Sequence, residues 1–141
     1  MFSSIITKLF LGCLLTPVPT ELQQPWMQAC ESWWPYHAQV SIRYCEGYDE
    51  CEKVMAFSGG LYSFQKHTIT VTRERVRPEL MDPALYNMGE VTERYLLLLH
   101  EYGHALGLPH SSRDDSVMHP GWTWPLALEP SKEDFETLRE R

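Results

Sequence analysis

The repeat of apolar residues along the chain predicts three helices. Between residues 21 and 36, apolar side chains recur every three or four positions, which is the spacing of one face of an α-helix. The residues on that face are Leu22, Trp26, Cys30 and Trp33. Residues 91–106 show the same spacing over a longer stretch, and Gly107 is typical of the residue that ends a helix. Residues 130–141 predict a third helix, with Ser131 placed to cap it.

Three segments between the first two helices have the alternation or the turn signals of β-strands. Residues 38–45 and 67–76 alternate apolar and polar positions, and the second segment presents one polar face. Residues 53–64 contain two short apolar runs on either side of the Gly59–Gly60 pair, which predicts a β-hairpin. Helices that flank a group of strands, rather than alternating with them, indicate an α+β fold with a small sheet.

The first 20 residues differ from the rest of the chain and resemble a secretory leader. A lysine-bearing start, the apolar run LFLGCLL and the helix-breaking TPVPT follow one another in the order of a signal peptide. The apolar run is too short to span a bilayer, which needs roughly 20 residues. A buried N-terminal strand or helix is one alternative. Another is a lipoprotein site at which Cys13 carries a lipid anchor, although Phe10 stands where leucine is usual. Residues 21–141 then form a single domain.

Composition and charge favour a globular, exported protein. Hydrophobic residues make up 43% of the chain and aromatic residues 12%, which is enough for a packed core. The formal net charge is −7 and no basic run is present, which argues against a nucleic-acid partner. Cys45 and Cys51 flank the polar loop EGYDE and are the expected disulfide in an oxidising compartment. The alternative is that all the cysteines are free, small and buried.

The stretch HEYGHALGLPH has the spacing of a metal site on a helix. Histidines four positions apart project from nearly the same helical face, so His100 and His104 can bind one ion. Gly107 permits a turn that returns His110 to the same ion as a third ligand. Three imidazole nitrogens hold Zn²⁺ and leave a fourth position for water, and Glu101 lies where it can reach that water.

Surface histidines that meet by chance, and a purely structural zinc site, are the alternatives. Chance seldom places histidines, a glutamate and a glycine at these fixed positions in a chain of this composition. A structural zinc site usually closes its fourth position with another protein ligand, which would leave Glu101 without a role. We therefore expect a catalytic site. Asp114 and Asp115 either orient a ligand histidine or, as we prefer, belong to a turn in SRDDS.

The stretch HEYGHALGLPH resembles the signature H-E-x-x-H-x-x-G-x-x-H of the metzincin zinc peptidases. The longer LLHEYGHALGLPHS resembles their matrixin branch, and DSVMHP resembles the methionine turn beneath the metal, with Met118 as its methionine. The resemblance implies a zincin-like α+β fold with a small twisted mixed β-sheet, an active-site helix, an N-terminal helix and a C-terminal helix. It implies one catalytic Zn²⁺, because the loops that hold further metal ions in matrixins have no counterpart here.

By this resemblance the protein is a secreted or otherwise exported, monomeric zinc endopeptidase that binds an extended peptide along a sheet edge. Glu101 would act as general base toward a zinc-activated water, and residues 67–76 would be the edge strand. Matrixins continue M-Y-P-x-Y after the turn, so His119, Pro120 and Trp122 are expected to line the pocket for the residue after the cut. The alternatives are a zinc hydrolase of non-peptide amides and a non-catalytic zinc module that holds a peptide or partner in the same cleft. Retention of Glu101 argues against the second.

Overall fold

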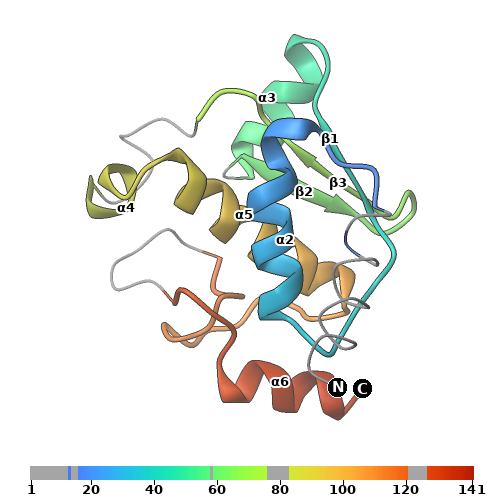
Figure 1. Ribbon diagram of the computed structural model, residues 1–141, viewed down its shortest axis with the longest axis vertical. Coiled ribbons are helices and arrows are strands. Elements are labelled where there is room, and N and C mark those ends of the chain that lie inside the picture. The colour runs from blue at the N-terminus through green and yellow to red at the C-terminus, as the bar shows by residue number, and fades with distance from the viewer. Residues whose placement is uncertain (1–12, 14–15, 58, 76–82, 121–126) are drawn as a thin grey trace.

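The computed structural model describes residues 13, 16–57, 59–75, 83–120 and 127–141 (Figure 1). These residues form a short 3-10 helix, η1, with five α-helices and three strands. In chain order the elements are η1 Thr20–Leu22, α2 Gln23–Ser32, β1 Ser41–Tyr44, α3 Tyr48–Ala56, β2 Gly60–Ser63, β3 Thr68–Val71, α4 Pro83–Asn87, α5 Glu90–Ala105 and α6 Lys132–Arg139. The predicted α+β fold, with a small mixed sheet and N-terminal, central and C-terminal helices, is confirmed.

The three described strands form one sheet in the order β1-β3-β2. Strand β3 lies in the centre, parallel to β1 and antiparallel to β2. The expectation that residues 67–76 form the sheet edge is therefore wrong, and within the described sheet β2 is the edge strand that contacts helix α5.

The polar face predicted for this segment is covered, because every residue of β3 is buried. Its threonine hydroxyls find partners inside the fold. Thr68 donates to the Lys66 carbonyl at 2.9 Å, and Thr70 accepts from the Arg43 guanidinium at 3.2 Å. Threonine suits a strand as well as valine does, so alternation alone did not distinguish a solvated face from a satisfied buried one.

The hairpin predicted over residues 53–64 is wrong in its first half. Residues 53–56 belong to helix α3, and strand β2 begins at Gly60. Gly59, with a φ of 96°, occupies the left-handed region in the turn between them. The hairpin of the fold is β2–β3 instead. An apolar run of a few residues shows no distinct period, so it does not separate helix from strand.

Helices α2 and α5 pack against each other (Figure 1), and their facing residues belong to the core. The ring of Trp26 on α2 stacks on Tyr102 of α5, with centroids 4.7 Å apart. Trp33 Nε1 donates to the Leu99 carbonyl at 2.8 Å, which satisfies the indole inside the core. Helix α5 also contacts β2 and β3. It is therefore held rigidly between helix and sheet, as a helix that carries a functional site needs to be.

Helix α6 begins at the predicted cap and lies at the opposite end of the view from the sheet (Figure 1). Ser131 Oγ accepts from the Asp134 amide at 3.1 Å, and Asp134 Oδ2 accepts from the Ser131 amide at 2.9 Å. This reciprocal capping box satisfies two amides that the helix leaves without partners. Phe135 then meets Trp33 edge-on at 5.8 Å between centroids, which docks α6 on α2.

Two disulfides use all the cysteines of the chain. The predicted Cys45–Cys51 bond is present, and the free-cysteine alternative is excluded. Cys13 is bonded to Cys30 of α2, a pairing that the sequence pattern does not predict. The Cys13 sulfur that a lipid anchor would use is therefore occupied. Residues 1–12 and 14–15 lie outside the described part, so the leader stays a prediction. Of the helices described, none has the length and apolar character that crossing a bilayer requires.

Candidate metal centre

Helix α5 and the turn that follows it bring three histidines to one point. His100 and His104 lie one helical turn apart on α5. The chain turns at Gly107, whose φ is 108°, and then presents His110 to the same point. One ligand nitrogen from each histidine lies within 4.8 Å of the others. His100 Nε2 and His110 Nε2 are 3.3 Å apart.

The spacing of one histidine pair is that of two ligands of one tetrahedral metal ion. Two nitrogens that each lie about 2.0–2.1 Å from a tetrahedral ion are separated by about 3.3–3.4 Å. The measured 3.3 Å between His100 and His110 agrees with that separation. No fourth His, Cys, Asp or Glu joins the group among the described residues. Three imidazoles with an open fourth position are the donor set typical of catalytic zinc.

Backbone carbonyls orient two of the imidazoles. His100 Nδ1 donates to the Val117 carbonyl at 2.7 Å, and His104 Nδ1 donates to the Leu108 carbonyl at 2.8 Å. A proton held on Nδ1 leaves the Nε2 lone pair free for a metal. The sequence offers only Asp114 and Asp115 for this role, because backbone carbonyls leave no signal in a sequence.

The two aspartates lie elsewhere, as the turn interpretation predicts. Asp115 accepts two hydrogen bonds from the Arg113 guanidinium, at 2.9 and 2.8 Å. Asp114 lies 3.6 Å from His119 Nε2 and its side chain is 88% exposed. Among the described residues, neither carboxylate forms a hydrogen bond or ion pair with His100, His104 or His110.

Burial shifts the pKa values of ionisable side chains at the centre. It lowers the pKa of His100 to about 4, and it also lowers the pKa of His104, so both are neutral near pH 7 as ligation requires. Burial raises the pKa of Glu101 to about 8, opposed by the hydrogen bond from the Tyr62 amide. A cation held by the imidazoles would oppose this rise further, because an opposite charge favours the carboxylate.

Glu101 faces the cleft between α5 and the edge strand. Its Oε1 accepts from the Tyr62 amide of β2 at 3.0 Å. Its Oε2 lies 3.9 Å from His100 Nε2. One oxygen is therefore anchored to the sheet while the other points toward the histidine nitrogens. A carboxylate in this position can accept a proton from a water molecule beside the metal.

Met118 lies against helix α5 at Gly103. In the sequence, Gly103 lies between the two histidines of that helix. Its side chain is 1% exposed. A Cβ added at Gly103 would collide with Met118 Sδ and lie 3.0 Å from Trp33 Cζ2. The glycine therefore permits the close approach of Met118 to the helix.

We expect Gly103→Ala to destabilise the protein by about 1–3 kcal/mol, the usual cost of overpacking a core. Helix propensity alone predicts the opposite sign, since alanine is favoured over glycine inside a helix by about 1 kcal/mol. Urea unfolding measures the difference, and Ala105→Gly on the same helix calibrates the propensity term. A Gly103→Ala protein more stable than the wild type would show that Met118 does not pack against this helix.

A cleft of about 800 Å³ runs past the histidines, between strand β2 and the loop after α5. Glu101 and the three histidines line it. The predicted pocket residues His119 and Pro120 also line it, whereas Trp122 lies outside the described residues. On the other side, Gly60, Leu61 and Tyr62 of β2 line the cleft. The strand beside the cleft is thus β2, not the residues 67–76 proposed from the sequence.

Comparison with known proteins agrees with this geometry. The family model described as Matrixin matches residues 27–140 of the chain. A stretch of 44 residues is 46% identical to matrix metalloproteinase-25 of Homo sapiens. That stretch covers 31% of this chain and 8% of the human protein, so the chain spans only a small part of its relative. No solved structure matches the chain.

Proposed function

Because the chain belongs to the matrixin family, whose model matches residues 27–140, we propose that it is a zinc-dependent endopeptidase. The observation that carries the proposal is the juxtaposition of three imidazoles with the anchored carboxylate of Glu101 in an open cleft. His100, His104 and His110 are the proposed ligands of one Zn²⁺. A zinc ion bound there would act as a Lewis acid, which lowers the pKa of a bound water and polarises the carbonyl of the peptide bond to be cleaved.

Glu101 is the proposed general base and then general acid. Its free oxygen takes a proton from the attacking water and returns it to the departing amine, so the peptide bond breaks without a protein nucleophile. The Tyr62 amide holds the other oxygen at 3.0 Å, which keeps the carboxylate aimed at the histidines. Burial makes the charged carboxylate costly, so it releases a bound proton less readily than an exposed carboxyl does.

Strand β2 is the proposed surface for an extended substrate. Its position at the sheet edge leaves one row of backbone groups unpaired with β3, and an added peptide strand can bind such a row. The Tyr62 amide belongs to this row, and it donates to Glu101, which lines the cleft. The outer backbone groups of β2 therefore face the cleft. His119 and Pro120 are proposed to line the pocket for the residue after the cut, and Trp122 remains an expectation from the sequence. We expect a hydrophobic residue there, which profiling with a peptide library tests.

Export is part of the proposal. The chain has two disulfides. Disulfides persist in oxidising compartments and are rare in reducing ones. The leader-like residues 1–20 support the same conclusion from the sequence.

Zinc binding and peptide hydrolysis together test the function. The oxidised protein is expected to bind one zinc per chain and to cleave a fluorogenic peptide, with the cleavage lost on chelation and restored by zinc. His104→Ala should weaken zinc binding by more than the roughly 100-fold that indirect partners of a ligand contribute. His37→Ala is the matched control, since His37 binds the Tyr102 hydroxyl outside the cleft.

Zinc binding without cleavage of any peptide would favour the non-catalytic binding module. Cleavage of small amides alone would favour a hydrolase of non-peptide amides. Hydrolysis that persists after chelation would contradict the zinc mechanism.

A further inference from the structure

We propose that Ser116 and Asp134 form a positioning pair that couples helix α6 to the metal centre. The bond between them fixes the turn whose Val117 carbonyl orients His100. The inference rests on the proposed zinc site and adds residues that no metal-ligand motif contains. Ser116 is the last residue of the SRDDS stretch, for which the sequence predicts a turn.

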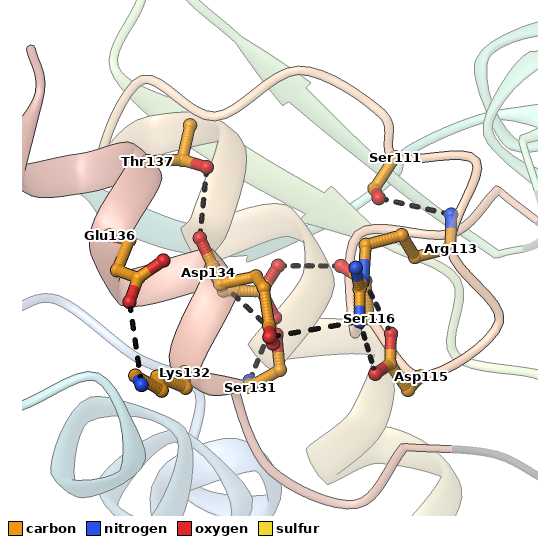
Figure 2. A network of polar contacts seen from close by, with 10 residues as sticks. Ser111, Arg113, Asp115, Ser116, Ser131, Lys132, Asp134, Glu136 and Thr137 are labelled. Carbon is orange, nitrogen blue, oxygen red and sulfur yellow. Dashed lines mark hydrogen bonds and ion pairs between the residues drawn. The ribbon is translucent and has the colours of Figure 1, made fainter.

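The pair is buried and closely bonded. Ser116 is 4% exposed and Asp134 is 5% exposed. Ser116 Oγ donates to Asp134 Oδ1 at 2.6 Å, and Figure 2 shows Asp134 on α6 facing Ser116 across the loop. The second oxygen, Asp134 Oδ2, accepts from the Ser131 amide at 2.9 Å. One carboxylate therefore serves both the start of helix α6 and the turn at Ser116.

The Ser116 hydroxyl, held by Asp134, also binds the backbone of the turn that contains Met118. Its Oγ accepts from the Met118 amide at 3.0 Å while its proton goes to Asp134. Its carbonyl accepts from the His119 amide at 3.2 Å. The hydroxyl thus has a defined donor and a defined acceptor, and residues 116–119 are held in one conformation.

The same turn contacts the elements that carry two of the proposed ligands. Val117, held between Ser116 and Met118, accepts from His100 Nδ1 at 2.7 Å. The Met118 carbonyl accepts from the amide of Ser111, the residue after His110, at 3.0 Å. A shift of the turn would therefore rotate the His100 imidazole and move the loop that carries His110. Helix α6, which contributes no ligand, in this way positions the metal site.

Loss of a partner that orients a ligand costs 10–100-fold in metal affinity. Ser116 acts through one further contact, so we expect Ser116→Ala to raise the zinc dissociation constant by roughly tenfold. Asp134→Ala should do the same. Because both act through one bond, the double variant should bind zinc no more weakly than the weaker single variant. Competition with a chromophoric chelator measures these constants.

Ser131→Ala is the matched control. It removes the hydroxyl that caps the same helix but keeps the Ser116–Asp134 bond. This variant should lower the unfolding temperature and leave the zinc dissociation constant within about twofold of wild type. If Ser131→Ala weakens zinc binding as much as Ser116→Ala does, the effect is general loosening of α6 and the positioning role is refuted. Unchanged zinc affinity in Ser116→Ala refutes it too.

A second measurement separates this inference from the proposed function. In the zinc-free protein, the nitrogen chemical shifts of the His100 imidazole report which nitrogen carries the proton. Ser116→Ala should shift His100 toward a mixture of the two tautomers, whereas Ser131→Ala should not. Failure of the wild type to bind zinc would overturn the proposed function alone. An unaltered His100 signal in Ser116→Ala would overturn the coupling.

Discussion

Replacement of Glu101 by glutamine is expected to lower kcat for peptide hydrolysis by roughly 10²–10⁴-fold, the usual contribution of a general base. Glutamine keeps the shape of the side chain and an oxygen that can accept from the Tyr62 amide, which lies 3.0 Å from Glu101 Oε1. It lacks a basic oxygen that can take a proton from water. Zinc binding should persist at one ion per chain, since Glu101 is not among the three proposed ligands.

Glu90→Gln is the matched control for this experiment. Glu90 lies on the same helix, its side chain is 58% exposed, and it lies 3.9 Å from Arg94. An exposed ion pair of this kind contributes little to stability, so the variant should retain full activity. Retention of more than about a tenth of the activity in Glu101→Gln would contradict the assigned role. Loss of zinc would show that the carboxylate acts in metal binding instead.

Removal of the Cys13–Cys30 disulfide is expected to lower the free energy of unfolding by about 3 kcal/mol. The bond closes a loop with a sequence separation of 17, and both cysteines lie in the core at 2% and 0% exposure. Its main effect in the chain-entropy description is to restrict the unfolded chain. The double variant Cys13→Ala with Cys30→Ala, studied by urea unfolding, gives the value without an unpaired thiol.

The second disulfide provides the internal comparison. Cys45 and Cys51 have a sequence separation of only 6, so removal of their bond is expected to cost less, about 2 kcal/mol. The experiment also bears on the leader. Processing after residue 20 would remove Cys13, and the Cys30 thiol would then react with a thiol reagent in the unfolded protein. The mass of the mature, non-reduced protein distinguishes the two states.

Much of the candidate metal centre was predictable because its geometry is local. The spacing of His100 and His104 places both side chains on one face of any α-helix, whatever surrounds it. Gly107 and His110 follow within six residues of His104, so no contact with a distant segment is needed to place the His110 nitrogen near the other two. The capping box at Ser131 is local in the same sense, and it formed as expected.

The errors arose where the outcome depends on distant segments. Residues 67–76 look like a half-exposed edge strand, yet β3 lies between β1 and β2 and all of its residues are buried. Residues 53–56 were assigned to a strand and lie in helix α3, since a short apolar run has no distinct period. Cys30 was not paired with Cys13, because the pairing depends on how the N-terminal segment packs on α2.

By itself, then, the sequence determined the proposed ligands, the proposed base and the helix that presents them, because residues three or four apart on a helix keep their relation in any fold. Only the tertiary structure decided that β2 borders the cleft and that Val117 and Leu108 orient the imidazoles. It also brought Ser116 to Asp134, 18 residues along the chain. These contacts join segments that no local periodicity relates, and packing around α5 brings them together.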